Sequence, residues 1–252
     1  MTTTLPQKLD QLSLTTMSRH LDQTIADAAT NNLSFAATLE RLADLELEAR
    51  RRRSIERRVK MSRLQGQYSI DAFSFAHHKS RQQARLRILK LLDLDFLLKG
   101  TNLVFVGNPG VGKTMLAKIV AWRACQGNHR VLFTTAMDML NHLLASQVDH
   151  SLVRKLKVYT EPTLLICDEL GYLSLDQQNS NLFYQVISDR HAHKRSTAIT
   201  TNTAFSDWGN ILFNTTIATA IADRLVENSE VFLLGGESFR KAGKNPSQPA
   251  ES

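Results

Sequence analysis

The sequence predicts an α/β protein whose core holds a parallel five-stranded sheet and is preceded by a small all-helical N-terminal domain. Beyond Gly100, five short apolar runs alternate with stretches of helical periodicity. A glycine-rich loop follows the first of these runs and opens a helical stretch. Before residue 65, apolar side chains recur every three or four positions instead, which is typical of amphipathic helices.

The five apolar runs are rich in β-branched and aromatic residues, as buried strands are. Strands are expected at 103–107, 131–135, 164–168, 197–201 and 231–234. Helices are expected between them, near 113–126, 137–146, 176–192 and 215–227. Alternation of this kind is typical of a parallel sheet covered by helices on both faces.

The first part of the chain is expected to be helical from about residue 15 to residue 64. Phe35, Leu39, Leu42 and Leu45 are spaced as the apolar stripe of one helix. The phrase "QGQYSIDAFSF" then breaks the periodicity, and another helix is expected from about 80 to 98. We therefore expect a helical domain at 1–66, a linker at 67–79, the α/β core at 80–240 and a disordered tail at 241–252.

Positive charge is concentrated in one segment. The whole chain carries +7, yet residues 41–90 hold fourteen Lys and Arg against five Asp and Glu, so all other residues sum to −2. Such a local excess indicates an element that binds a polyanion. A solvated charged helix, or one packed on an acidic subunit, is the alternative. The candidate contacts are Arg50, Arg51, Arg52, Arg53, Arg57, Arg58 and Lys60.

Several classes of protein are disfavoured by composition. No run of eighteen apolar residues is present, so we expect no membrane span. The first fourteen residues lack the apolar centre of a signal peptide. Cys125 and Cys167 are the only cysteines, which fits a reducing compartment. A cytoplasmic location is therefore expected.

The segment "GNPGVGKT" matches the phosphate-binding pattern G-x-x-x-x-G-K-[ST] between an expected strand and an expected helix. Backbone amides of such a loop surround phosphate groups. Lys113 would reach the β- and γ-phosphates, and Thr114 would offer its hydroxyl to Mg²⁺. The expected ATP-binding residues of this loop are Gly107, Asn108, Pro109, Gly110, Val111, Gly112, Lys113, Thr114 and Met115.

Polar residues end two of the later apolar runs. Asp168 ends the run "LLICD", where a buried carboxylate needs a partner such as phosphate-bound Mg²⁺. Glu169 follows directly and would polarise an attacking water as a general base. Asn202 comes just after "AITT" and would hold that water or contact the γ-phosphate; a turn-forming asparagine is the alternative.

The phosphate loop, the Asp168–Glu169 pair and Asn202, in this order, resemble the AAA+ ATPases. The flanking phrases sharpen the resemblance: "NLSFAATLERLADLELEARRRRSIERRVKMSRL", "IDAFSF", "DELGY", "SDR" and "GESFR" are similar to those of the IstB-type transposition helper ATPases. That group is itself similar to the helicase loader DnaC. The resemblance extends from about Leu14 to Arg240, almost the whole chain.

The resemblance implies a homo-oligomer that binds duplex DNA with little sequence preference, carries ATP between its subunits, and recruits and stimulates a cognate transposase. It implies that Arg224 is the arginine finger for the neighbouring subunit and that Arg240 is the second sensor. Arg190 stays an alternative finger, with a surface residue or a DNA contact as its other interpretations. A surface ion pair with Asp223 or Glu227 is the alternative for Arg224. The helical lid common in AAA+ proteins is expected to be absent or minimal.

Two other functions share parts of this pattern. A replicative helicase loader of the DnaC type uses the same core, and the arginine-rich N-terminal helix favours the transposition helper over it. A metabolic P-loop kinase would need a lid over its acceptor substrate, and no segment of the sequence suggests one.

Overall fold

A computed structural model of the chain describes residues 4–171 and 175–238. The chain divides into two compact units, Met1–Arg57 and Arg58–Ser252. The division lies inside a helix and before residue 66, where the sequence analysis places the end of the first domain. The expected tail at 241–252 lies outside the described residues. None of the helices within the described ranges combines the length and the apolar character needed to cross a bilayer.

The N-terminal unit is helical, as expected. Its small core joins Met17 and Leu21 to Leu42. The expected apolar stripe is wrong for Phe35 and Leu39, whose side chains are 85% and 48% exposed. Only Leu42 and Glu46 of their helix are buried, because the partner helix covers the middle of α3 and not its first turns. The helices are α1 Leu5–Gln11, α2 Thr15–Thr30 and α3 Phe35–Met61.

Glu46 is the polar centre of this unit, with only 3% of its surface exposed. One carboxylate oxygen accepts hydrogen bonds from the backbone amides of Thr16 (2.8 Å) and Met17 (3.2 Å) at the start of α2. The other accepts from Nε of Arg50 (2.9 Å) and from Nη2 of Arg53 (3.1 Å). Burial alone would raise the pKa of Glu46, but these hydrogen bonds and the charge of Arg50 outweigh it and lower the pKa to about 2.

We expect Glu46→Ala to lower the free energy of unfolding of this unit by about 2–4 kcal/mol, because two helix-terminal amides and two guanidinium groups lose their shared partner. Hydrogen exchange of the α2 and α3 backbone amides measures the change. Glu48→Ala is the matched control, since Glu48 is exposed and forms only a 3.5 Å ion pair with Arg52. Equal effects of the two substitutions would contradict the assigned role.

The same contact predicts a dependence on pH. The folded-state pKa of Glu46 lies below its ordinary value of 4.5, so the carboxylate stabilises the unit above that pH. Its contribution should be lost as the pH falls from 4.5 toward 2, and Glu46→Gln should remove this part of the pH dependence.

The second unit contains the expected parallel sheet. All neighbouring strands pair in parallel, in the order β2-β3-β4-β1-β5. The fold class predicted from sequence is therefore confirmed, with strand ends that agree to within two residues. The strands are β1 Asn102–Gly107, β2 Val131–Thr135, β3 Leu164–Leu170, β4 Ser196–Thr201 and β5 Ser229–Leu234.

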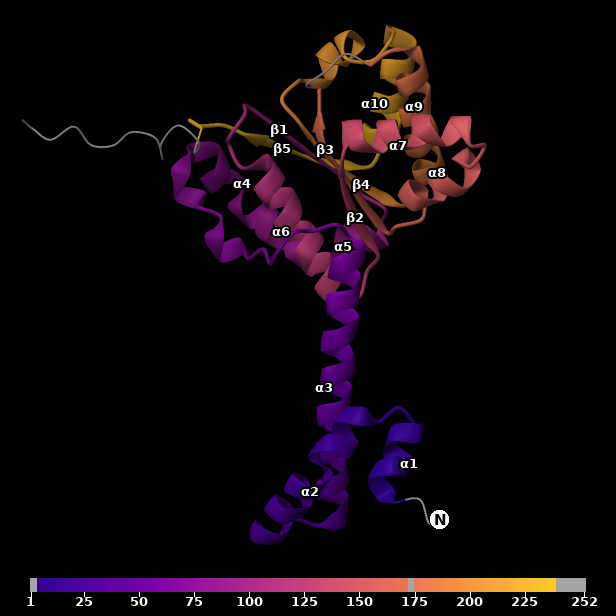
Figure 1. Ribbon diagram of the computed structural model, residues 1–252. Helices are drawn as coiled ribbons and strands as arrows, with labels where there is room; N and C mark the ends of the chain where they lie inside the picture. Colours follow the sequence, from indigo (N-terminus) through magenta and orange to yellow (C-terminus); the bar gives the residue numbers. More distant parts are fainter. Residues whose placement is uncertain (1–3, 172–174, 239–252) are drawn as a thin grey trace, which may run out of the picture. The chain divides into compact units, whose positions relative to one another are not determined.

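Helices cover both faces of this sheet (Figure 1). One face packs against α4 Lys79–Lys90, α5 Asp95–Leu98 and α6 Lys113–Gln126. The other packs against α7 Ala136–Val148, α8 Leu152–Thr160, α9 Gln177–Ala192 and α10 Thr215–Val226. Each face has its own apolar core, which is why the strands are apolar on both sides and show no alternation in the sequence.

Three parts of this unit differ from the expectation. The helix expected at 80–98 is interrupted after Lys90 by the turn η3 Leu91–Asp93 and by Leu94, whose φ is 67°. Helix α8 was not expected. The expected linker at 67–79 contains the turns η1 Ile70–Ala72 and η2 Phe75–His77, and Phe73 between them is only 3% exposed in the core.

Candidate nucleotide-binding site

The phosphate loop connects the carboxyl end of β1 to the first turn of α6. Gly110 and Gly112 have φ values of +82° and +87°, which side chains with a Cβ rarely adopt. A Cβ at Gly112 would also lie 3.0 Å from Nη2 of Arg81 and 3.3 Å from the ring of Phe73. The loop therefore needs glycine at this position both for its backbone turn and for the close approach of these side chains.

The Lys113 side chain curls back into the loop. Its ammonium group donates hydrogen bonds to the carbonyl oxygens of Gly107 (2.7 Å) and Asn108 (2.9 Å), and 6% of the residue is exposed. The charge is thus already held among the loop's backbone groups, where a bound phosphate would lie. The loop predicted from sequence forms with Lys113 at its centre.

Asp168 joins three elements at the carboxyl edge of the sheet. Its Oδ1 accepts hydrogen bonds from the hydroxyls of Thr114 on α6 (3.0 Å) and of Thr200 on β4. The residue is 4% exposed. Carboxylate and hydroxyl oxygens are the ligands that Mg²⁺ prefers, directly or through water, so Thr114 and Asp168 fit the metal role expected of them.

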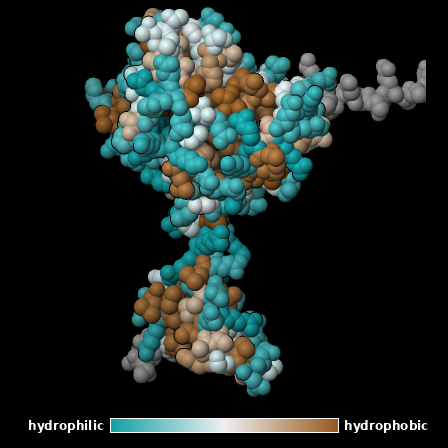
Figure 2. Space-filling view, turned by 180° about the vertical axis from the view of Figure 1, so that it is seen from behind, coloured by the Kyte–Doolittle hydropathy of each residue, from teal (hydrophilic) through white to brown (hydrophobic). Residues whose placement is uncertain are grey.

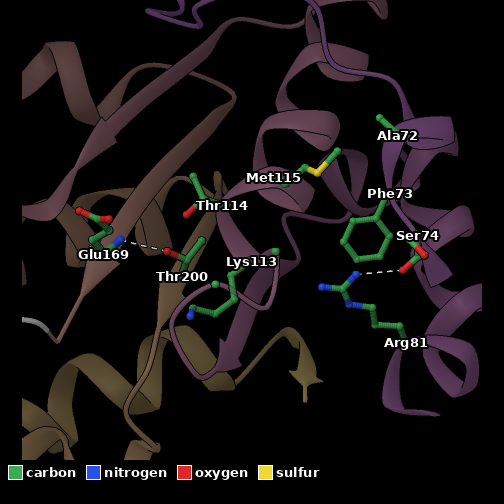
Figure 3. A pocket seen from close by; sticks show the side chains of 11 residues that line it. Ala72, Phe73, Ser74, Arg81, Lys113, Thr114, Met115, Glu169 and Thr200 are labelled. Carbon is green, nitrogen blue, oxygen red and sulfur yellow. Dashed lines mark hydrogen bonds between the residues drawn. The ribbon is translucent and has the colours of Figure 1, made fainter. Parts of the chain in front are cut away.

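Glu169 lies at an irregularity of β3. The register of β3 against β4 shifts between Cys167 and Leu170, and the φ of Glu169 is +61°. Its backbone amide donates to the Thr200 hydroxyl at 2.9 Å. A bulge turns a side chain away from the regular alternation of a strand. The exposed Glu169 is one of the residues that line the pocket with Lys113 and Thr114, and in Figure 3 its backbone amide faces Thr200 while its carboxylate points away from Thr114 and Lys113.

The pocket has a volume of about 390 Å³ and extends well beyond the phosphate loop. One wall comes from the segment expected to be a linker and from the start of α4 (Figure 3). The lining residues are Ala72, Phe73, Ser74, Arg81, Gly110, Gly112, Lys113, Thr114, Met115, Glu169 and Thr200. Segment 67–79 therefore contributes directly to the site.

Arg81 fixes this wall to the phosphate loop. It is 1% exposed, and its guanidinium group donates to the carbonyl oxygens of Ser74 (2.9 Å) and of Val111 within the loop. Its Cζ atom lies 4.6 Å from the centre of the Phe73 ring. Burial lowers the pKa of Arg81. Sequence reasoning missed both residues, although Phe73 lies in the phrase "IDAFSF" that carried part of the family resemblance.

Thr200 within β4, and not Asn202 after it, lines the pocket. Asn202 is exposed, accepts a hydrogen bond from the Thr203 hydroxyl at 3.3 Å, and is absent from the residues that line the pocket as described above. Thr200 lines it instead and binds Asp168. Thr200 precedes Asn202 by two residues, and residues two apart point to the same side of a strand. The expected position of Asn202 could therefore have identified Thr200 as a residue of the pocket.

The two finger candidates lie in different surroundings. Arg190 is fully buried, and its guanidinium group donates to carbonyl oxygens of Tyr159 (2.9 Å), Pro162 (2.9 Å) and Ser196. The alternative that Arg190 reaches a neighbouring subunit is therefore wrong, because its side chain is used to connect α9 with the segments before β3 and β4.

Arg224 is half-buried on α10, away from the pocket of its own chain. It donates to the carbonyl of Ala220 at 2.8 Å and lies 4.8 Å from the centre of the Tyr184 ring. Within the described ranges it has no ion pair, and Glu227 pairs with His191 at 2.7 Å instead. Arg240 lies outside the described residues. Ser238, two residues before Arg240, lies against the phosphate loop. A Cβ added at Gly110 would collide with the Ser238 side chain.

The seven basic residues expected to contact DNA fall into groups. Arg50 and Arg53 bind Glu46, and Arg52 pairs with Glu48 at 3.5 Å. Arg58 is half-buried and belongs to the second unit. The remaining three are exposed, with no carboxylate at ion-pair distance in the described part of the chain: Arg51, Arg57 and Lys60.

The sheet order, the phosphate loop after β1 and the acidic pair in β3 define an ATP-binding protein of the AAA+ class. The sequence profile of the IstB-like ATP binding protein family matches residues 7–247, and the chain belongs to this family. The resemblance noted in the sequence is thereby confirmed.

Relatives align over nearly their whole length. The chain is 36% identical over 230 residues to the ATP-binding protein of insertion sequence IS5376 from Geobacillus stearothermophilus, covering 91% of this chain and 90% of the relative. It is 35% identical to that of insertion sequence IS232 from Bacillus thuringiensis, covering 94% and 93%. The corresponding IS21 protein of Pseudomonas aeruginosa is 31% identical, with 92% and 86% covered.

Solved structures support the fold. The DnaC helicase loader matches with a TM-score of 0.55 and 24% identity, over 62% of this chain and 91% of that one. DnaI matches with a TM-score of 0.56 and 19% identity, over 71% and 92%. At this level of identity the likeness concerns the fold of the core alone.

Proposed function

We propose that this protein is an ATP-hydrolysing oligomer that binds duplex DNA without sequence preference, selects target DNA and recruits and activates the transposase of its insertion sequence. The observation that carries the enzymatic part is the position of Glu169. A carboxylate held by a bulge with φ +61°, on the pocket that contains Lys113, suits the activation of water beside a γ-phosphate.

The pocket residues divide the work of hydrolysis. Lys113 would exchange its carbonyl partners for phosphate oxygens, and Thr114 and Asp168 would hold Mg²⁺, which neutralises charge on the phosphates. The Thr200 hydroxyl donates to the Asp168 carboxylate and accepts from the Glu169 amide, so it holds both residues in position. We place Asn202 among the residues that order the attacking water once nucleotide is bound, since it immediately follows β4.

The apolar end of the pocket would take the adenine base. Phe73 offers an aromatic ring and Met115 an apolar thioether, and Ala72 and Ser74 line the same pocket. Arg81 links this wall to the loop carbonyl of Val111. Base binding and phosphate binding would therefore depend on one another.

DNA binding is assigned to the exposed basic residues of α3. Contacts to phosphate need charge rather than a pattern of base edges, so they provide affinity without sequence preference. Glu46 uses Arg50 and Arg53 to join α3 to α2. Arg52 pairs with Glu48 and Arg58 is half-buried, which leaves Arg51, Arg57 and Lys60 as the principal contacts.

Oligomerisation has its own support in the N-terminal unit. Figure 2 shows apolar surface on this unit. The exposed apolar side chains there are Leu5, Leu12, Ile25, Leu33, Phe35, Leu39 and Leu47. A small unit with this many exposed apolar side chains is typical of one that associates with another protein surface. We assign this surface to contacts between copies of the chain, with ATP between the ATPase cores.

The insertion-sequence relatives favour transposition over helicase loading. They align with more than nine-tenths of this chain, helical N-terminus included, whereas the DnaC structure covers 62% of it. The test is to mix the protein with the transposase from its own insertion sequence and measure strand transfer into a target duplex. No stimulation by the protein with ATP would reject the transposition role.

Replacing Arg51, Arg57 and Lys60 together by alanine should weaken binding to unrelated duplexes by similar factors. The log–log salt slope should become shallower by up to about 0.9 per lost phosphate contact. Titration of labelled duplexes at several salt concentrations measures both. The triple variant should keep the melting temperature of the wild type, because none of the three side chains has an ion pair among the described residues. Unchanged affinity and slope would exclude these residues as contacts.

A further inference from the structure

A second basic site lies in the ATPase unit, in a groove of about 430 Å³. Three elements form it: the end of α3, the residues that begin β2, and α8 with the turn after it. Four cationic side chains line it, with Glu161 as the carboxylate among the lining residues. The four are Arg58, Arg130, Arg154 and Lys157.

Two of the four cations have no carboxylate at ion-pair distance among the described residues. Glu161 approaches only Arg130, at 3.4 Å. Arg154 and Lys157 are exposed on α8, and no carboxylate of the described chain lies within ion-pair distance of either. Their helix packs its other side into the core through Leu152, Leu156 and Tyr159. The fold therefore holds these cations on a supported helix rather than on a loop.

The groove is separate from the nucleotide pocket. Arg130 and Pro162 come just before β2 and β3, so the groove lies at the amino ends of these strands. Thr200, Asp168 and the phosphate loop lie at the carboxyl ends of the sheet. ATP and a ligand of the groove would thus bind to opposite edges.

The fold, and not the local sequence, concentrates the charge of the groove. All residues outside 41–90 sum to −2, yet Arg130, Arg154 and Lys157 come from that part of the chain and gather at one place. Arg58 adds a residue from the arginine-rich run itself. The groove therefore begins at one of the residues expected to contact DNA.

We propose that this groove binds the sugar–phosphate backbone of duplex DNA and is a second DNA contact, made by the ATPase unit. This rests on the proposed DNA-binding function. Three of the four cations are arginines, which bind phosphate oxygens in a bidentate way. The four cations come from three separate elements and line one groove, so they can contact several phosphates of one strand. Met61 and Val158 line the same groove and suit the apolar faces of the sugars.

The test compares two double variants that lose the same charge. Arg154→Ala with Lys157→Ala should weaken duplex binding and lower the salt slope by up to about 1.8, for two phosphate contacts. Lys79→Ala with Lys90→Ala is the control, since both residues are exposed on α4, outside the groove and the nucleotide pocket. Charge reversal at Arg154 and Lys157 to glutamate should lower the affinity further. Binding of ATP and the melting temperature should not change in any of the alanine variants.

Each outcome decides between the possibilities. Equal loss in the two double variants means that only total charge matters and overturns the groove as a contact. A lower melting temperature with an unchanged salt slope means that the cations serve the ends of α3 and α8, and it also overturns the proposal. Loss of binding to a polyglutamate peptide with retained DNA binding would assign the groove to an acidic protein instead. Wild-type protein that binds no duplex would reject the DNA-binding function itself, and the groove with it.

Discussion

Glu169→Gln should reduce the rate of ATP hydrolysis by about 10²–10⁴ and leave ATP binding intact. An amide cannot accept a proton from water, but it keeps the size of the carboxylate. The backbone at Glu169, with φ +61° and its amide bound to Thr200, does not depend on the charge of the side chain. The pocket and Lys113 should therefore be unchanged, so that nucleotide remains bound without turnover.

Phosphate release and binding of a fluorescent ATP analogue separate the two effects. Lys113→Ala is the opposite control, since loss of the ammonium group within the loop should weaken nucleotide binding itself. Glu230→Gln is the matched control for the substitution, because Glu230 is half-buried on β5, is not among the residues that line the pocket as described above, and pairs with Arg87 at 3.4 Å. Wild-type turnover in Glu169→Gln would remove Glu169 from the role of base.

The sheet and the phosphate loop could be predicted because their signals are local. Each strand is a short apolar run bounded by polar residues, and each connection is long enough for a crossover helix. The loop is a contiguous motif whose glycines are required by its own backbone. Asp168 and Thr114 follow from the same logic, since parallel strands end at one edge of the sheet, and the structure brings the two within 3.0 Å.

The remaining contacts depend on residues that are distant in sequence. Phe73 and Arg81 reach the pocket only because segment 67–79 folds against the loop, and no periodicity signals that approach. Buried charge misled the sequence interpretation in a similar way. Arg190 is a charged residue near the end of α9 whose spacing places it on the buried face with Phe183 and Ile187, and its guanidinium group is enclosed by backbone carbonyls.

The arginine-rich run shows the same limit for an interaction surface. By sequence, its members at helical spacing are equivalent phosphate contacts. In the folded unit, Arg50 and Arg53 share the buried carboxylate of Glu46 and support the packing of α2 on α3. An alanine substitution across Arg50 to Arg53 would therefore mix loss of folding with loss of DNA contact, which is why the exposed members provide the cleaner test.

Arg224→Ala should reduce DNA-stimulated ATP hydrolysis by about 10³ or more, the scale of a finger that stabilises charge on the γ-phosphate. That factor corresponds to about 4 kcal/mol of barrier. The contacts that Arg224 makes within its own chain are weak in comparison. It donates one hydrogen bond to the Ala220 carbonyl and lies against the Tyr184 ring, and such a cation–π pair contributes about 0.5–1 kcal/mol at exposed sites. The side chain can therefore leave them for a phosphate on a neighbouring subunit at small cost.

The decisive measurement mixes two inactive proteins. Arg224→Ala keeps its own Lys113 site, and Lys113→Ala keeps Arg224, so an interface that pairs the intact halves should recover hydrolysis that neither variant shows alone. ATP affinity of the isolated Arg224→Ala subunit should stay near that of the wild type, because Arg224 lies away from the pocket of its own chain. Arg123→Ala, an exposed arginine on α6 that donates to the Leu92 carbonyl, should behave as the wild type. Full activity of Arg224→Ala, or no recovery in mixtures that co-assemble, would exclude a finger acting between subunits at this position; Arg190, enclosed by its own chain, could not replace it.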